Sequence, residues 1–253
     1  MARTFDALEK AEKAISGHAE SGHGDVTRVF DSPPVIKQKQ PGPTTSARIT
    51  EEYNRLRQNI LAALPELKTR ALLFTSSTAG EEAAKVLAAF GRVLARSGER
   101  VLLVDTDLRG PTLHRLFGMD GGPGVAQLFS GKGELVAAMK RTETEGLLMV
   151  TAGRPVANPF SLLESASIDA LIESMRREAD WVLLTAPPVN AYNDTVALAK
   201  KVDGVVLVVE AEKTRWEVAR SAVERLEDAR ANILGVVLNN RKLHIPGWIY
   251  KRL

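Results

Sequence analysis

The amino-acid sequence predicts an α/β fold in which a doubly wound, mainly parallel sheet carries helices on both faces. Six short, nearly all-apolar runs have the pattern of strands that are buried on both sides; they are RALLFTSS, RVLLVDTD, LLMVTAG, WVLLTAPP, GVVLVVEA and ILGVVLNN, which begin at residues 70, 100, 147, 181, 204 and 233. Helical patterns such as SIDALIESMRREA and TRWEVARSAVERLEDARA lie between them. This alternation is typical of parallel strands joined by crossover helices.

Length and composition fit one large α/β domain with a short extension. The chain has 253 residues, of which 44% are apolar and 26% charged, and a net charge of +3, so the whole molecule has no polyanion-binding character. It has no cysteine, which excludes disulfides, thiolate metal sites and thiol nucleophiles. No stretch approaches the roughly 18 to 20 apolar residues that span a bilayer, and the N-terminus lacks the apolar core of a signal peptide. We expect a cytoplasmic protein that binds no nucleic acid.

Changes in composition along the chain predict four parts: a short amphipathic helix over 1–16, a flexible linker over 17–47, the α/β domain over 48–240, and a basic and aromatic tail over 241–253. Phe5 and Leu8 would lie on the apolar face of the first helix, against a partner or against the parent domain. The linker is rich in Gly, Pro, Ser and Thr, with one short extended piece at VTRVF. We interpret His18 and His23 within it as solvated side chains rather than as a metal pair.

The α/β domain is predicted to open with a helix over 50–64. Thr50 and the acids that follow it form a capping pattern. Leu56, Ile60 and Leu64 then fall on one face of this helix.

The stretch TSSTAGEEAAKVLAAF, residues 75–90, has the layout of a phosphate-binding loop, because an apolar strand runs into a small-residue turn and then a helix. The loop would contain Ser76, Ser77, Thr78, Ala79, Gly80, Glu81 and Glu82, and Ala83 and Ala84 would open the helix. Its two acids would face the place of a triphosphate. Lys85 lies two residues beyond Ala83, about 200° around the helix, so it should project to the opposite side. The alternative is an ordinary strand–turn–helix of a doubly wound sheet.

Two carboxylates follow the next predicted strand. Asp105 and Asp107 leave this buried strand two residues apart, at the edge where ligands of such sheets bind. Paired carboxylates there suit a Mg²⁺ site or an acid–base role. The alternative is helix capping and turn formation, with LRGPT as the turn.

Six blocks of the sequence together resemble a known family. They are FTSSTAGEEAAK, VLLVDTDLRGPTLHRLFG, GVAQLFSG, TAGRPVANPFSLLES, WVLLTAPPV and VDGVVLVVEAEKTR…ILGVVLNN, in this order. Residues 48–240 closely resemble the bacterial tyrosine kinases (BY-kinases), the capsule and exopolysaccharide chain-length regulators, and RTFDALEKAEK and IPGWIYKRL look like the ends of its stand-alone members. The resemblance implies a P-loop fold of the partition-ATPase kind, ATP with Mg²⁺ as substrate, autophosphorylation of a C-terminal tyrosine cluster, and a membrane polysaccharide co-polymerase as partner.

The Walker A motif of that family reads roughly SSxPGEGKS/T, and this chain departs from it at four positions. The lysine is replaced by Ala83, the Ser/Thr by Ala84, the last glycine by Glu82, and the proline by Ala79. A charge-assisted hydrogen bond to phosphate contributes about 1.5–3 kcal/mol. Loss of such contacts at the transferred phosphate affects the transition state more than nucleotide binding.

The other motifs of the family are kept in part. The Walker B carboxylate is replaced by Thr185, whereas Asp105 and Asp107 keep the second acidic motif. The tail holds Tyr250 alone in place of a tyrosine cluster. We therefore expect no cofactor, or weak binding of ATP or ADP with Mg²⁺.

Two hypotheses about function follow. The first is a pseudokinase that regulates exopolysaccharide synthesis or export through protein contacts. The second is an active kinase or ATPase that takes its cation from Arg109 or from a neighbouring subunit. A DNA-binding partition ATPase is disfavoured, because the sequence has no basic nucleic-acid stripe.

The resemblance also implies assembly. The oligomerisation helix of the family carries Glu, Arg and Arg at successive spacings of three; here the positions hold Glu51, Asn54 and Arg57, with Arg55 as a possible substitute. We expect a homo-oligomer or a hetero-oligomer. The basic and aromatic tail suits peripheral contact with a membrane or a partner groove, and the alternative is that Trp248 packs on its own domain.

Overall fold

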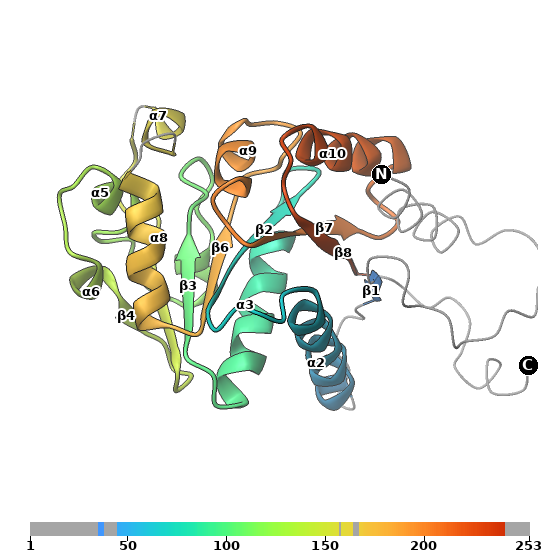
Figure 1. Ribbon diagram of the computed structural model, residues 1–253, viewed down its shortest axis with the longest axis horizontal. Coiled ribbons are helices and arrows are strands. Elements are labelled where there is room, and N and C mark those ends of the chain that lie inside the picture. The colour runs from blue at the N-terminus through green and yellow to red at the C-terminus, as the bar shows by residue number, and fades with distance from the viewer. Residues whose placement is uncertain (1–34, 38–44, 157, 164–166, 241–253) are drawn as a thin grey trace, which may run out of the picture.

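The computed structural model describes residues 35–37, 45–156, 158–163 and 167–240. Within them the chain forms one eight-stranded sheet in which only β4 is antiparallel to its neighbour (Figure 1). The strand order across the sheet is β1 (Val35–Lys37), β8 (Ile233–Asn239), β7 (Gly204–Glu210), β2 (Arg70–Ser76), β6 (Trp181–Thr185), β3 (Val101–Asp105), β5 (Leu147–Val150) and β4 (Lys140–Arg141).

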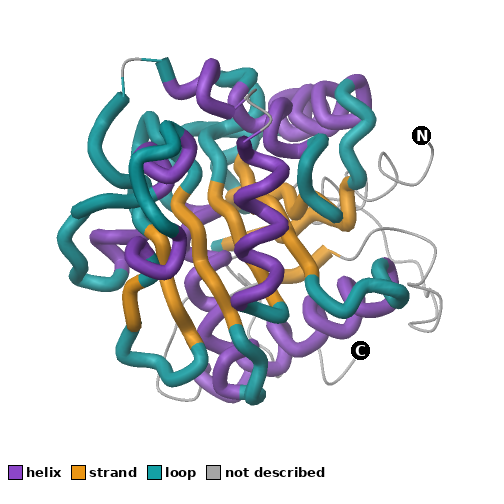
Figure 2. Tube along the Cα trace, turned by 60° about the vertical axis from the view of Figure 1, so that its left-hand side comes forward, coloured by secondary structure: helices purple, strands orange, loops and turns teal. Residues whose placement is uncertain are grey.

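Helices cover both faces of this sheet, as Figure 2 shows. One face is covered by α2 (Thr45–Ala63), α3 (Glu82–Arg96) and α4 (Leu113–Leu116). The other is covered by α5 (Val125–Phe129), α6 (Leu135–Ala138), α7 (Pro159–Leu163), α8 (Ser167–Glu178), α9 (Asp194–Ala199) and α10 (Trp216–Asp228). The predicted doubly wound fold is therefore confirmed.

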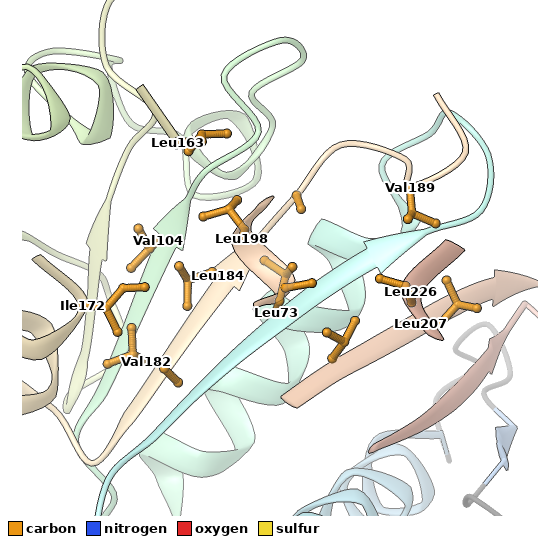
Figure 3. Packing of buried hydrophobic residues seen from close by; sticks show 14 of the residues in the cluster. Leu73, Val104, Leu163, Ile172, Val182, Leu184, Val189, Leu198, Leu207 and Leu226 are labelled. Atoms are coloured by element: carbon orange, nitrogen blue, oxygen red, sulfur yellow. The ribbon is translucent and has the colours of Figure 1, made fainter. Parts of the chain in front are cut away.

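Neighbouring residues of the central strands point to opposite layers of the core. Leu73 packs in the layer that contains α8 and α10 (Figure 3), and Leu72 packs in the layer that contains α2 and α3. Both side chains are fully buried. This double burial is the reason that the strands are apolar throughout rather than alternating.

An aromatic group joins α2 and α3 to the sheet. The ring of Phe90 lies at the centre, with its centroid 6.1 Å from Tyr53, 6.0 Å from Phe74 and 5.9 Å from Trp181. All four side chains are no more than 1% exposed. The predicted face of α2 is confirmed by the burial of Leu56 and Ile60 and by Leu64 packing beside them, and Tyr53 belongs to it as well.

Strand β1 and the first three residues of α2 lie inside the range predicted as a linker, so that prediction is wrong for these residues. Strand β1 pairs in parallel with β8, and three residues are too few to leave a periodic pattern. Helix α2 begins at Thr45 rather than at Thr50, because no Gly or Pro interrupts the intervening TSARI.

Several predictions fall outside the described residues. They concern the helix over 1–16, the extended piece at VTRVF, the two linker histidines, and the tail with Trp248 and Tyr250. Within the described ranges, no helix combines the length and the apolar character that a bilayer crossing requires.

Candidate functional site

The loop between β2 and α3 has the predicted strand–loop–helix layout. Its start is fixed by the Ser76 hydroxyl, which donates to the carbonyl of Thr78 at 2.7 Å. Gly80 follows with a φ of 152°, a conformation that other residues rarely adopt. Ser77 is 3% exposed, and its Oγ has no hydrogen-bond partner within the described part of the chain.

The first turn of α3 presents methyl groups to the core. Ala83 and Ala84 are 4% and 5% exposed and pack in the same apolar layer as Phe90. These are the two positions where the sequence resemblance implies a lysine and a hydroxyl. Neither residue provides a polar side-chain group for a phosphate or a metal.

The two acids of the loop are each paired with a cation. The Arg115 guanidinium lies 2.7 Å from Glu81 Oε1, and the hydrogen bond that it donates lowers the pKa of Glu81. Lys85 Nζ lies 3.0 Å from Glu82 Oε1 and 3.7 Å from Glu81 Oε2, and chiefly its hydrogen bond to Glu82 raises the pKa of Lys85. As predicted, Lys85 lies on the opposite side of α3 from the buried Ala83, with its side chain 48% exposed. It still reaches the acids of the loop, because Lys85 and Glu82 are three residues apart on one helix face.

The carboxylate of Asp105 is buried inside the fold at the end of β3. Asp105 lies opposite Thr185 in the pairing of β3 with β6, and the Thr185 hydroxyl donates to Asp105 Oδ1 at 2.9 Å. The backbone N–H groups of Thr112 and Leu113 each donate to Oδ2 at 3.0 Å. Asp105 is 0% exposed, and burial raises its pKa to about 6. These contacts fit the alternative interpretation, in which Asp105 caps the short helix α4.

Asp107 forms the turn that follows. The N–H groups of Arg109 and Gly110 donate to Asp107 Oδ1 at 3.1 and 2.8 Å, and burial is the main cause of the raised pKa of Asp107. The Arg109 guanidinium donates to both oxygens of the buried Asp194, at 2.7 and 3.1 Å, and lies 4.5 Å from the ring centroid of Tyr192. Arg109 is therefore already engaged by Asp194, a residue that the sequence analysis did not single out.

The described residues contain no group of three or more His, Asp or Glu side chains placed to hold a metal. Both oxygens of Asp105 accept hydrogen bonds from the protein. A role for Asp105 and Asp107 as Mg²⁺ ligands stays a prediction.

The residues predicted for oligomerisation lie on the partly exposed side of α2. Glu51 pairs with Arg55 at 2.7 Å, and Arg57 forms an ion pair with Glu99. Asn54 is half-buried. Their role in assembly stays a prediction.

Comparison with known proteins places the chain in a family. A model for ParA proteins, described as NUBPL iron-transfer P-loop NTPases, matches residues 75–248. The tyrosine-protein kinase YwqD of Bacillus subtilis is 31% identical over 77% of this chain and 82% of its own length. The chain belongs to the bacterial tyrosine-kinase family of P-loop NTPases.

Solved structures agree with this assignment. The chimerical protein CapA2B2 superimposes with a TM-score of 0.77 at 25% identity, over 93% of this chain and all of that one. The kinase domain of Escherichia coli tyrosine kinase ETK gives a TM-score of 0.74 at 27% identity, over 78% of this chain and 77% of that one. The predicted P-loop NTPase fold is confirmed.

Proposed function

We propose that this chain is a catalytically inactive member of the kinase family, acting as a regulatory or scaffolding component of exopolysaccharide or capsule biosynthesis and export. The observation that carries the proposal is the burial of Ala83 and Ala84 where a kinase loop needs a cation and a hydroxyl. Phosphoryl transfer depends on positioning and on neutralising the developing charge. Ala83 and Ala84 supply only methyl groups, so neither can position the phosphate or neutralise its charge.

The contacts of Asp105 support the same proposal. Its carboxylate is held by Thr185 and by two backbone N–H groups, so it serves the fold at the place where a kinase would bind metal. Thr185, the residue at the Walker B position, donates a hydrogen bond instead of providing a second carboxylate. Three of the roughly four acceptor sites of this carboxylate are thus occupied by the protein, which leaves about one for a divalent cation.

The biological setting is inferred from the family. The resemblance implies a membrane polysaccharide co-polymerase as partner, which would hold this chain at the inner face of the plasma membrane. Assembly with copies of itself or with related chains would use the side of α2 that carries Glu51, Asn54 and Arg57.

A second candidate function is a weak ATP-binding kinase or ATPase. It is favoured by the strand–loop–helix layout and by the two cations beside the loop, because Lys85 and Arg115 both reach its acids. Either cation could turn toward a bound phosphate if it left its acid.

Calorimetric titration with ATP and Mg²⁺ separates the two functions. The scaffold proposal expects no binding heat up to millimolar ATP, with YwqD titrated in parallel as the positive control. Micromolar, Mg²⁺-dependent binding with measurable hydrolysis would support the second function. Incorporation of γ-³²P from ATP that disappears in Asp105→Asn would contradict the scaffold proposal directly.

A further inference from the structure

Glu82 connects the phosphate-binding loop to the carboxyl end of β8. One oxygen of its carboxylate, Oε2, accepts hydrogen bonds from the side-chain amides of Asn239 and Asn240, the latter at 2.9 Å. The other oxygen, Oε1, accepts from Lys85 at 3.0 Å. The Glu82 side chain is only 18% exposed, compared with 41% for Glu81. Glu82 is thus a partly buried acceptor of three donors.

The same group of hydrogen bonds extends to the end of β7. Asn240, which has a left-handed φ of 58°, also donates to Glu210 Oε1 at 3.2 Å. Glu210 ends β7 and is paired with Lys213 at 2.6 Å. Glu82 and Asn240 therefore join the start of α3, which follows β2 and its loop, to the carboxyl ends of the neighbouring strands β7 and β8.

This connection depends on the side chain at position 82. A glycine there, as in the family motif, has no group that can accept from Asn239 or Asn240. Nearby Glu81 instead pairs with Arg115 and Lys85, and within the described residues it makes no hydrogen bond to either asparagine. The two neighbouring acids therefore have different roles and provide a matched pair for substitution.

We propose that Glu82 acts as an internal ligand that closes the carboxyl edge of the sheet between the start of α3 and the ends of β7 and β8, holding this edge in one arrangement without nucleotide. This proposal rests on the scaffold function above and gives a further structural reason for the loss of nucleotide binding. The amide donors of Asn239 and Asn240 are already occupied by the chain's own carboxylate. Restoring a lysine and a hydroxyl to the loop is then insufficient to recover nucleotide binding.

Hydrogen exchange of the full chain tests the closure. Glu82→Ala is expected to speed amide exchange at least about tenfold in peptides covering 236–240 and 210–214, because these segments lose charge-assisted hydrogen bonds. Glu81→Ala should change the same peptides by less than about twofold. Equal exchange in Glu82→Ala and the wild type would overturn the proposal.

A second variant covers the case in which Glu82→Ala does not fold. Glu82→Gln keeps the volume of the side chain and one carbonyl oxygen but removes the charge. It should also exchange faster than the wild type in the same two segments. If Glu82→Ala is unfolded and Glu82→Gln exchanges at the same rate as the wild type, the charge of Glu82 does not hold this edge of the sheet, and the proposal is overturned.

Titration with ATP and Mg²⁺ tests the consequence. The double variant Ala83→Lys/Ala84→Thr should bind at least about tenfold more weakly than the triple variant that adds Glu82→Ala. Equal affinity of the two would refute Glu82 as the obstacle. The two proposals fail separately: ATP binding by the wild type contradicts the scaffold function, whereas unchanged exchange in the Glu82 variants contradicts only the closure.

Discussion

Replacement of Asp105 by Asn should stabilise the protein progressively as the pH rises. Burial raises the pKa of Asp105 from 3.8 to about 6, so the folded state binds this proton more tightly than the unfolded state between these two values. The contribution of Asp105 to the free energy of unfolding is therefore fully present below pH 3.8 and is lost as the pH rises through about 6. The difference between these two pKa values corresponds to a loss of about 3 kcal/mol in the free energy of unfolding when Asp105 ionises. Asn cannot ionise and keeps an oxygen for the N–H groups of Thr112 and Leu113.

Urea unfolding at several values between pH 4 and pH 8 measures this effect. The stability of Asp105→Asn minus that of the wild type should increase by about 2.5 kcal/mol from pH 4 to pH 8, because a small part of the effect is already present at pH 4. Asp169→Asn, which changes an acid whose side chain is 59% exposed, serves as the control and should give a nearly flat difference. A flat or falling difference for Asp105→Asn would show that Asp105 is not a destabilised buried carboxylate.

Three further substitutions test the packing around the site by urea unfolding. Phe90→Ala removes the centre of the aromatic group and should cost about 3–5 kcal/mol; a loss below about 1 kcal/mol would contradict its central role. Arg109→Met leaves the buried Asp194 unpaired and should cost about 3–5 kcal/mol, and adding Asp194→Asn should recover most of it; no recovery would mean that the pairing is not the cause. Gly124→Ala places a Cβ 2.0 Å from the Thr151 carbonyl oxygen and should cost at least about 3 kcal/mol, so wild-type stability would refute this close approach.

The parts of the fold that bury many side chains were predictable from the sequence. All six apolar runs are strands of the sheet, because double burial requires an unbroken apolar segment. Strands β1 and β4 have three and two residues. They join the sheet through backbone hydrogen bonds, which leave no pattern of side chains.

The site was predictable only where its residues are close in the chain. The loop and the acids at 105 and 107 were located by spacing and family resemblance. The contact of Glu82 with Asn239 joins residues 157 positions apart, and it depends on a strand order that the sequence does not specify. The direction of Lys85 was predicted from the turn of the helix, but its ion pairs with Glu81 and Glu82 were not, because only its angle from Ala83 was considered.

The burial of Tyr53, Leu56 and Ile60 has a consequence for any protein that docks on α2. With these side chains inserted in the core, the helix cannot roll or shift without disrupting the aromatic group around Phe90. Its outward side is therefore preorganised, so a partner would lose little affinity to ordering this helix. The same rigidity means that recognition there should proceed by rigid-body fit, with selectivity set by the shape and charge of the partner.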